Sequence, residues 1–84
     1  KNKTKIKGGE MEKLKRELSE IEEITDEMKR NLFWIHLNIL LVKDFLLSEA
    51  TKTEKESYFE IVKEHIKDYI HEIEKNLLNL KSKI

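Results

Sequence analysis

The stretch NLFWIHLNILLVKDFLL, from Asn31 to Leu47, decides how this chain folds. Apolar residues lie on nearly every side of the helix that this stretch would form, whereas the rest of the sequence is rich in Lys and Glu. A helix that is apolar all round has to be enclosed on several sides. Since the chain has only 84 residues, its fold depends on what encloses this segment.

The composition indicates long helices. The chain has no Cys and no Pro, and its only glycines are the pair Gly8-Gly9. These absences exclude disulfides and thiolate metal sites, and they leave too few turn-forming residues for a many-stranded sheet. A charged fraction of 40%, with Leu, Ile, Glu and Lys dominant, is typical of coiled coils and also suits a thermophile. The 17 basic and 17 acidic residues balance, so we expect no global attraction to nucleic acid.

An apolar seam with steps of three and four residues predicts one helix over residues 10–49. Thr25 is its one polar member. Up to Arg30 the seam is almost the only apolar part of the helix, whereas beyond it apolar residues also lie on the opposite side. The seam consists of Met11, Leu14, Leu18, Ile21, Thr25, Met28, Leu32, Ile35, Ile39, Val42 and Leu46.

The segment SEATKTEKE interrupts this pattern and predicts a connection to a second helix over residues 53–82. Thr53 with Glu56 fits a capping box, and Thr51 with Glu54 is the alternative. A connection this short places the two helices antiparallel. The predicted fold is all-α: a long helical hairpin over residues 10–84 with coiled-coil character. The second seam, with one extra residue before Leu77, comprises Phe59, Val62, Ile66, Tyr69, Ile73, Leu77, Leu80 and Ile84.

One hairpin cannot cover both sides of residues 31–47, so we expect two hairpins to form a four-helix bundle as a homodimer. A different protein on the same surface and a higher oligomer are the alternatives. We expect Thr25, Asn31 and Asn38 to set the register. Residues 10–30 outreach the second helix by about two turns, and a partner helix or the other protomer could dock there. The predicted dimer interface consists of Phe33, Trp34, Leu37, Leu40, Leu41 and Leu47.

Residues 1–9, KNKTKIKGG, are predicted to form a flexible basic arm. The residues Lys-Gly-Gly-Glu-Met can be encoded by a purine-rich ribosome-binding sequence running into a start codon, which would place the natural start at Met11. Small dimeric hairpins resembling the plasmid RNA-binding Rop-type bundle bind nucleic acid through a helix face. A nucleic-acid-binding dimer is therefore the alternative function, with contacts from Lys1, Lys3, Lys5 and Lys7.

His36, mid-helix in the most apolar segment, suggests a phosphoacceptor. A dimeric hairpin with a histidine on its first helix resembles the dimerisation and phosphotransfer element of sensor histidine kinases, over roughly residues 24–84. That family places an acidic residue directly after the histidine and a proline a few residues on. Here Leu37 follows and the chain has no proline, so proton transfer from the imidazole lacks its usual assistance. We therefore expect His36 to be a structural histidine, hydrogen-bonded at the edge of the bundle, with the phosphoacceptor as the alternative.

Asp68-x-x-His71, near His65 and Glu72, has the spacing of ligands in di-metal bundles. The second seam turns these residues toward solvent, so we expect neither a metal nor a cofactor. Residues 31–47 are shorter than the roughly 20 residues that a membrane span needs, and the basic start lacks a following apolar core. We expect a cytoplasmic, non-enzymatic homodimer that serves as a protein–protein interaction or regulatory assembly module.

Overall fold

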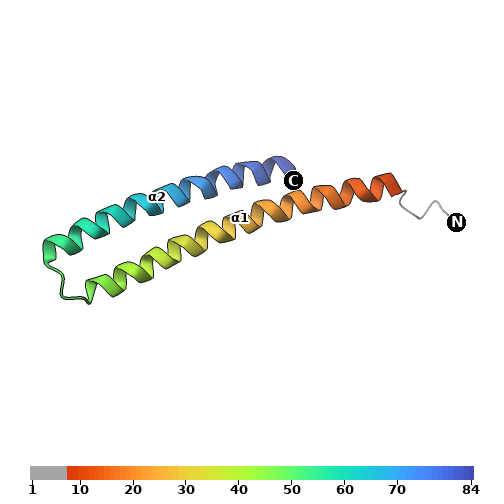
Figure 1. The fold of residues 1–84 in the computed structure, drawn as a ribbon. Helices are drawn as coiled ribbons and strands as arrows, with labels where there is room; N and C mark the ends of the chain where they lie inside the picture. Colours follow the sequence, from red (N-terminus) through yellow and green to blue (C-terminus); the bar gives the residue numbers. More distant parts are fainter. Residues whose placement is uncertain (1–7) are drawn as a thin grey trace.

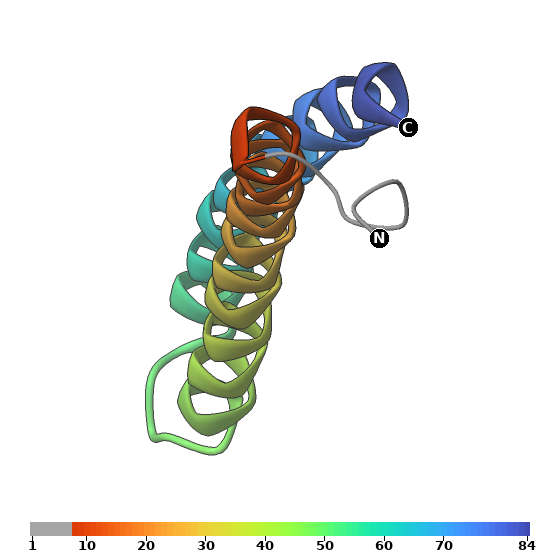
Figure 2. The same ribbon diagram turned by 90° about the vertical axis from the view of Figure 1, so that its right-hand side faces the viewer.

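The computed structural model describes residues 8–84, which form a two-helix hairpin (Figure 1). Helix α1 spans Gly8–Leu46 and helix α2 spans Lys52–Lys83. They run antiparallel, and a view nearly along α1 shows that α2 is inclined to it (Figure 2). The predicted all-α hairpin is confirmed, and no strand occurs in the described part of the chain.

The helix ends differ slightly from the expected ones. Helix α1 includes Gly8 and Gly9, which the sequence assigned to the arm, and it ends three residues before the expected position 49. The chain leaves α1 through a turn in which the hydroxyl of Ser48 donates a hydrogen bond to the carbonyl of Phe45, at 2.6 Å. This turn satisfies one of the carbonyls that a helix C-terminus leaves without an intrahelical donor.

A capping box starts α2. The Thr51 hydroxyl accepts from the backbone N–H of Glu54 at 3.1 Å, and the Glu54 carboxylate accepts from the backbone N–H of Thr51 at 2.9 Å. The alternative box of the sequence analysis is therefore the correct one, and the preferred pair Thr53 and Glu56 is wrong. The turn at Ser48 brings the chain to the helix N-terminus early enough for Thr51 to cap it.

The least exposed side chains of the two helices form the hairpin seam. Two contacts fix its register: Lys83 Nζ lies 3.0 Å from Glu20 Oε1, and the rings of Phe45 and Tyr58 pack with centroids 4.7 Å apart. The seam consists of Ile21, Ile24, Met28, Asn31, Ile35, Asn38, Val42 and Phe45 on α1, with Tyr58, Val62, Ile66, Tyr69, Ile73, Asn76 and Leu80 on α2.

This seam corrects the predicted one on α1. Leu32, Ile39 and Leu46 remain 56%, 43% and 46% exposed, while the asparagines at 31 and 38 are half-buried. From Ile21 onward, half of the predicted seam positions are kept and the other half move back by one residue, so the contact turns by about 50°, half of the roughly 100° that one residue turns a helix. Each asparagine amide donates to the carbonyl four residues earlier, Asn31 at 3.0 Å and Asn38 at 2.7 Å, which limits the cost of placing it there.

The seam on α2 also differs from the prediction. Tyr58 and Asn76 occupy the positions that were assigned to Phe59 and Leu77. With Asn76 three residues after Ile73, the steps near the end of α2 become regular and the expected extra residue disappears.

The hairpin has almost no interior. Among the described residues, the buried apolar side chains are Ile24, Val42 and Val62. The molecule measures 74 × 19 × 12 Å and its radius of gyration is 20.9 Å, whereas a compact chain of this length has about 12 Å. An isolated hairpin thus leaves most of its apolar side chains in contact with water.

Candidate interaction surfaces

The six residues predicted to form the dimer interface lie away from the hairpin seam, five of them on α1 and Leu47 directly after its end. We call them the outer face. Phe33 and Trp34 pack edge to face with centroids 5.5 Å apart, and Leu40, Leu41 and Leu47 line a shallow hollow near the connection. Five of the six are exposed, with Leu47 at 86%, and Leu37 is half-buried. The hairpin itself therefore does not cover this face.

A second apolar surface runs along α1, where sequence reasoning expected α2 to pack. We call it the leucine stripe, although Thr25 interrupts it. Its members recur every seventh residue, and the Thr25 hydroxyl donates back to the carbonyl of Glu22 at 2.9 Å. Apart from half-buried Thr25, the members are 39–67% exposed. The stripe consists of Met11, Leu18, Thr25, Leu32, Ile39 and Leu46.

Helix α2 extends the leucine stripe into a broader face. Ile70 and Leu77 are 44% and 43% exposed, and each lies one residue beyond a seam position of α2. In an antiparallel pair of helices, the columns next to the seam lie beside each other on the same side. Ile70 and Leu77 therefore border the same side of the hairpin as Leu32 and Ile39.

The first part of α1 extends beyond α2. Because Lys83, the last residue of α2, pairs with Glu20, residues 8–19 have no neighbouring helix within the hairpin. We call this segment the overhang. It spans about 18 Å and is longer than the two turns expected. Met11, Leu14 and Leu18 are 39%, 50% and 67% exposed on it.

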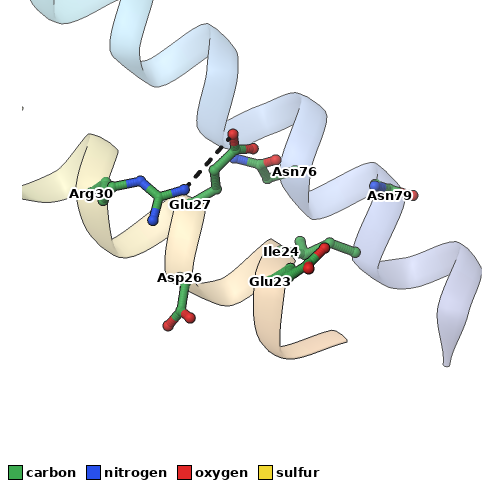
Figure 3. A pocket seen from close by; sticks show the side chains of 7 residues that line it. All are labelled: Glu23, Ile24, Asp26, Glu27, Arg30, Asn76 and Asn79. Carbon is green, nitrogen blue, oxygen red and sulfur yellow. Dashed lines mark ion pairs between the residues drawn. The ribbon is translucent and has the colours of Figure 1, made fainter. Parts of the chain in front are cut away.

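The opposite side of the hairpin has a polar hollow (Figure 3). Glu23, Glu27 and Arg30 of α1 face Asn76 and Asn79 of α2 across it. Arg30 Nη2 lies 4.0 Å from Glu27 Oε2. The Asn76 side chain is only 9% exposed and its Nδ2 has no hydrogen-bond partner. The hollow is open to solvent and mixed in charge, and it contains no arrangement of nucleophile and base.

Ion pairs cover the solvent side of α2. Lys63 pairs with Glu60 at 2.8 Å and Lys67 with Glu64 at 3.2 Å. The hydrogen bond from Lys63, and then its charge, lower the pKa of Glu60 below its usual value. Pairs this exposed contribute little to stability. They make much of this side of the hairpin polar, although Ile61 and Leu78 of α2 are also exposed, at 54% and 69%.

The candidate chemical residues are exposed. His36 lies on the surface of α1, and its expected hydrogen bond does not form within the described residues. Asp68 and His71 face solvent, where His71 Nδ1 lies 3.9 Å from Glu74 Oε1. Over residues 8–84, no three or more His, Asp or Glu side chains gather closely enough to hold a metal ion.

The basic residues Lys1, Lys3, Lys5 and Lys7, on which the nucleic-acid alternative depends, lie outside the described residues, as does most of the predicted arm. Within residues 8–84, neither helix combines the length and hydropathy needed to cross a bilayer.

Sequence reasoning missed the leucine stripe as a free surface and missed Asn76 as a seam residue. A signal for both was present. The set Ile24, Asn31, Asn38 and Phe45 has the same seven-residue spacing as the stripe, one position earlier.

Comparison with protein-family models, with curated proteins and with solved structures finds no match for this chain.

Proposed function

We propose that this chain is a non-enzymatic helical-bundle protein that forms a homodimer through residues 31–47 and serves as a protein–protein interaction or regulatory assembly module. The observation that carries the proposal is the exposure of large apolar side chains. Among the described residues, 17 of them are exposed, from Met11 to Ile84, and three are buried. Each large side chain left in water forgoes about 1.5–3 kcal/mol of burial free energy.

The surface area supports association. The accessible surface of the chain is 7116 Å², whereas a folded monomer of 10.1 kDa has about 5,300 Å². The excess is larger than the roughly 800 Å² that each partner buries in an interface of standard size. A second helical hairpin offers an elongated surface of matching shape.

The positions of the apolar surfaces support a role in assembly. The leucine stripe and the outer face lie on different sides of α1, and one flat contact with a second hairpin covers only one of them. The other remains available to a different protein. A dimer with a free apolar face on each protomer can hold two partner chains at a fixed separation, which is what an assembly module requires.

Equilibrium sedimentation tests the proposal. At micromolar concentration we expect a mass of about twice 10.1 kDa. A dimer contains Ile39 twice, so Ile39→Glu removes two buried apolar side chains from the interface. The lost apolar contacts should weaken association at least roughly 100-fold. The control is His71→Glu, because His71 faces solvent on α2, and it should leave the mass unchanged. A wild-type monomer at these concentrations would overturn the proposal.

A further inference from the structure

Two features of the hairpin lack a neighbour, and they lie at opposite ends of α1. At one end the overhang presents Met11, Leu14 and Leu18 with no helix beside them. At the other end, next to the connection, Ile39 and Leu46 belong to a segment that is apolar on nearly all sides. If the α1 helices of two copies packed antiparallel, the overhang of each copy would lie beside the connection end of the other copy.

The spacing of the leucine stripe restricts how two copies can pair. Because its members recur every seventh residue, an antiparallel partner can bring stripe residues opposite one another only in registers that differ by seven residues. When the two-fold axis passes between Met28 and Lys29, all six members find a counterpart. Met11 then lies opposite Leu46, Leu18 opposite Ile39, and Thr25 opposite Leu32. A register centred on Ile39 pairs only the last three members and leaves both overhangs uncovered.

We propose that a second copy of this chain packs antiparallel along the leucine stripe, with each overhang lying against the connection end of the other protomer. This inference rests on the proposed homodimer and specifies its geometry. It explains why the overhang carries apolar residues on one side although no helix of its own chain lies beside it, and why Ile39 and Leu46 stay exposed at the other end of α1.

Helix α2 fits the same arrangement. The pairs Glu20–Lys83 and Phe45–Tyr58 fix the register of the hairpin, and this register places Ile70 and Leu77 near the level of the two-fold axis. Both are exposed on the stripe side. Around the axis four helices run side by side, so Ile70 and Leu77 would be covered there. Phe59, 43% exposed, lies near the connection, where the overhang of the other copy would reach it.

This assignment changes the role of the outer face. Its six residues, which the sequence suggested as the dimer contact, point away from the stripe and stay accessible in the antiparallel dimer. They become the surface that a different protein would bind.

Disulfide trapping tests the geometry, because the chain has no native cysteine. The double variant Leu18→Cys/Ile39→Cys should oxidise to a covalent dimer, since the thiol at position 18 of each chain would meet the thiol at position 39 of the other copy. The two positions of one chain lie about 31 Å apart along α1, far beyond the roughly 7 Å limit between Cα atoms in a disulfide. The single variants Leu18→Cys and Ile39→Cys should stay non-covalent for the same reason.

The matched control is Leu18→Cys/Leu40→Cys, because position 40 lies about 100° round the helix from position 39. It should cross-link far less than the first pair. Self-linking of both single variants would indicate parallel chains, and self-linking of Ile39→Cys alone would indicate the shorter register. Either result overturns the proposed geometry and leaves the dimer intact. Sedimentation of the wild-type chain as a monomer would overturn the dimer as well.

Discussion

Replacing Asn76 with Leu should raise the melting temperature of the protein by roughly 10 °C. The side chain is 9% exposed, lies in the hairpin seam, and has no partner for its Nδ2. A buried donor without a partner costs about 1–3 kcal/mol, and Leu is also the better helix former by a few tenths of a kcal/mol. Together these terms give about 2 kcal/mol, and each kcal/mol shifts the melting temperature of a chain this size by about 4–8 °C.

Thermal unfolding followed by circular dichroism at 222 nm measures this shift. All variants must be compared at one protein concentration, since the melting temperature of an associating protein depends on it. Asn79→Leu is the control: Asn79 lines the same hollow but is exposed, so the change should stay within about 0.5 kcal/mol. If Asn76→Leu melts at or below the wild-type temperature, the amide has a partner and the reasoning fails.

Three further predictions concern single side chains. Asn38→Leu should raise the melting temperature and leave the mass in sedimentation unchanged, because Asn38 lies in the seam between α1 and α2 and not on the leucine stripe; a broader distribution of oligomers would contradict this. Thr51→Ala should cost about 1 kcal/mol of unfolding free energy because it removes the cap of α2, whereas Thr53→Ala should cost much less, and equal losses in urea unfolding would contradict the observed capping box. In an NMR titration the pKa of Glu60 should lie below the usual value of a glutamate and return toward that value in Lys63→Met. Because the pKa of Glu60 is lower in the folded protein than in the unfolded chain, the pair with Lys63 stabilises the fold at pH values above the unfolded-state pKa. This stabilisation is lost as the pH falls through the folded-state pKa.

The hairpin could be predicted from the sequence because its signals are local. Steps of three and four residues, the absence of proline, and a polar interruption near residue 50 determine two helices and one connection. The choice between the two capping boxes was open, because both fit the same pattern. It depends on how the chain leaves α1, where the hydroxyl of Ser48 binds the carbonyl of Phe45.

The seam was harder to predict because two overlapping patterns share half of their residues. Ile21, Met28, Ile35 and Val42 belong to either seam, and they combine with the leucine stripe on one side or with the set that contains Asn31 and Asn38 on the other. Apolarity alone favours the stripe. Helix α2 nevertheless packs against the asparagines, which satisfy their amides on their own helix, and the stripe is left for another partner. A pattern within one chain does not distinguish an intramolecular from an intermolecular contact.

The overhang makes local order depend on concentration. An isolated helix of twelve to fifteen residues is marginal in water, and residues 8–19 have no helix beside them in the hairpin. Their backbone amides should therefore exchange with deuterium quickly in dilute solution and slowly once a second chain covers them. Fraying of the overhang in one chain would then show that the connection end of the other chain is uncovered. A peptide-resolved exchange experiment could therefore follow assembly without any label.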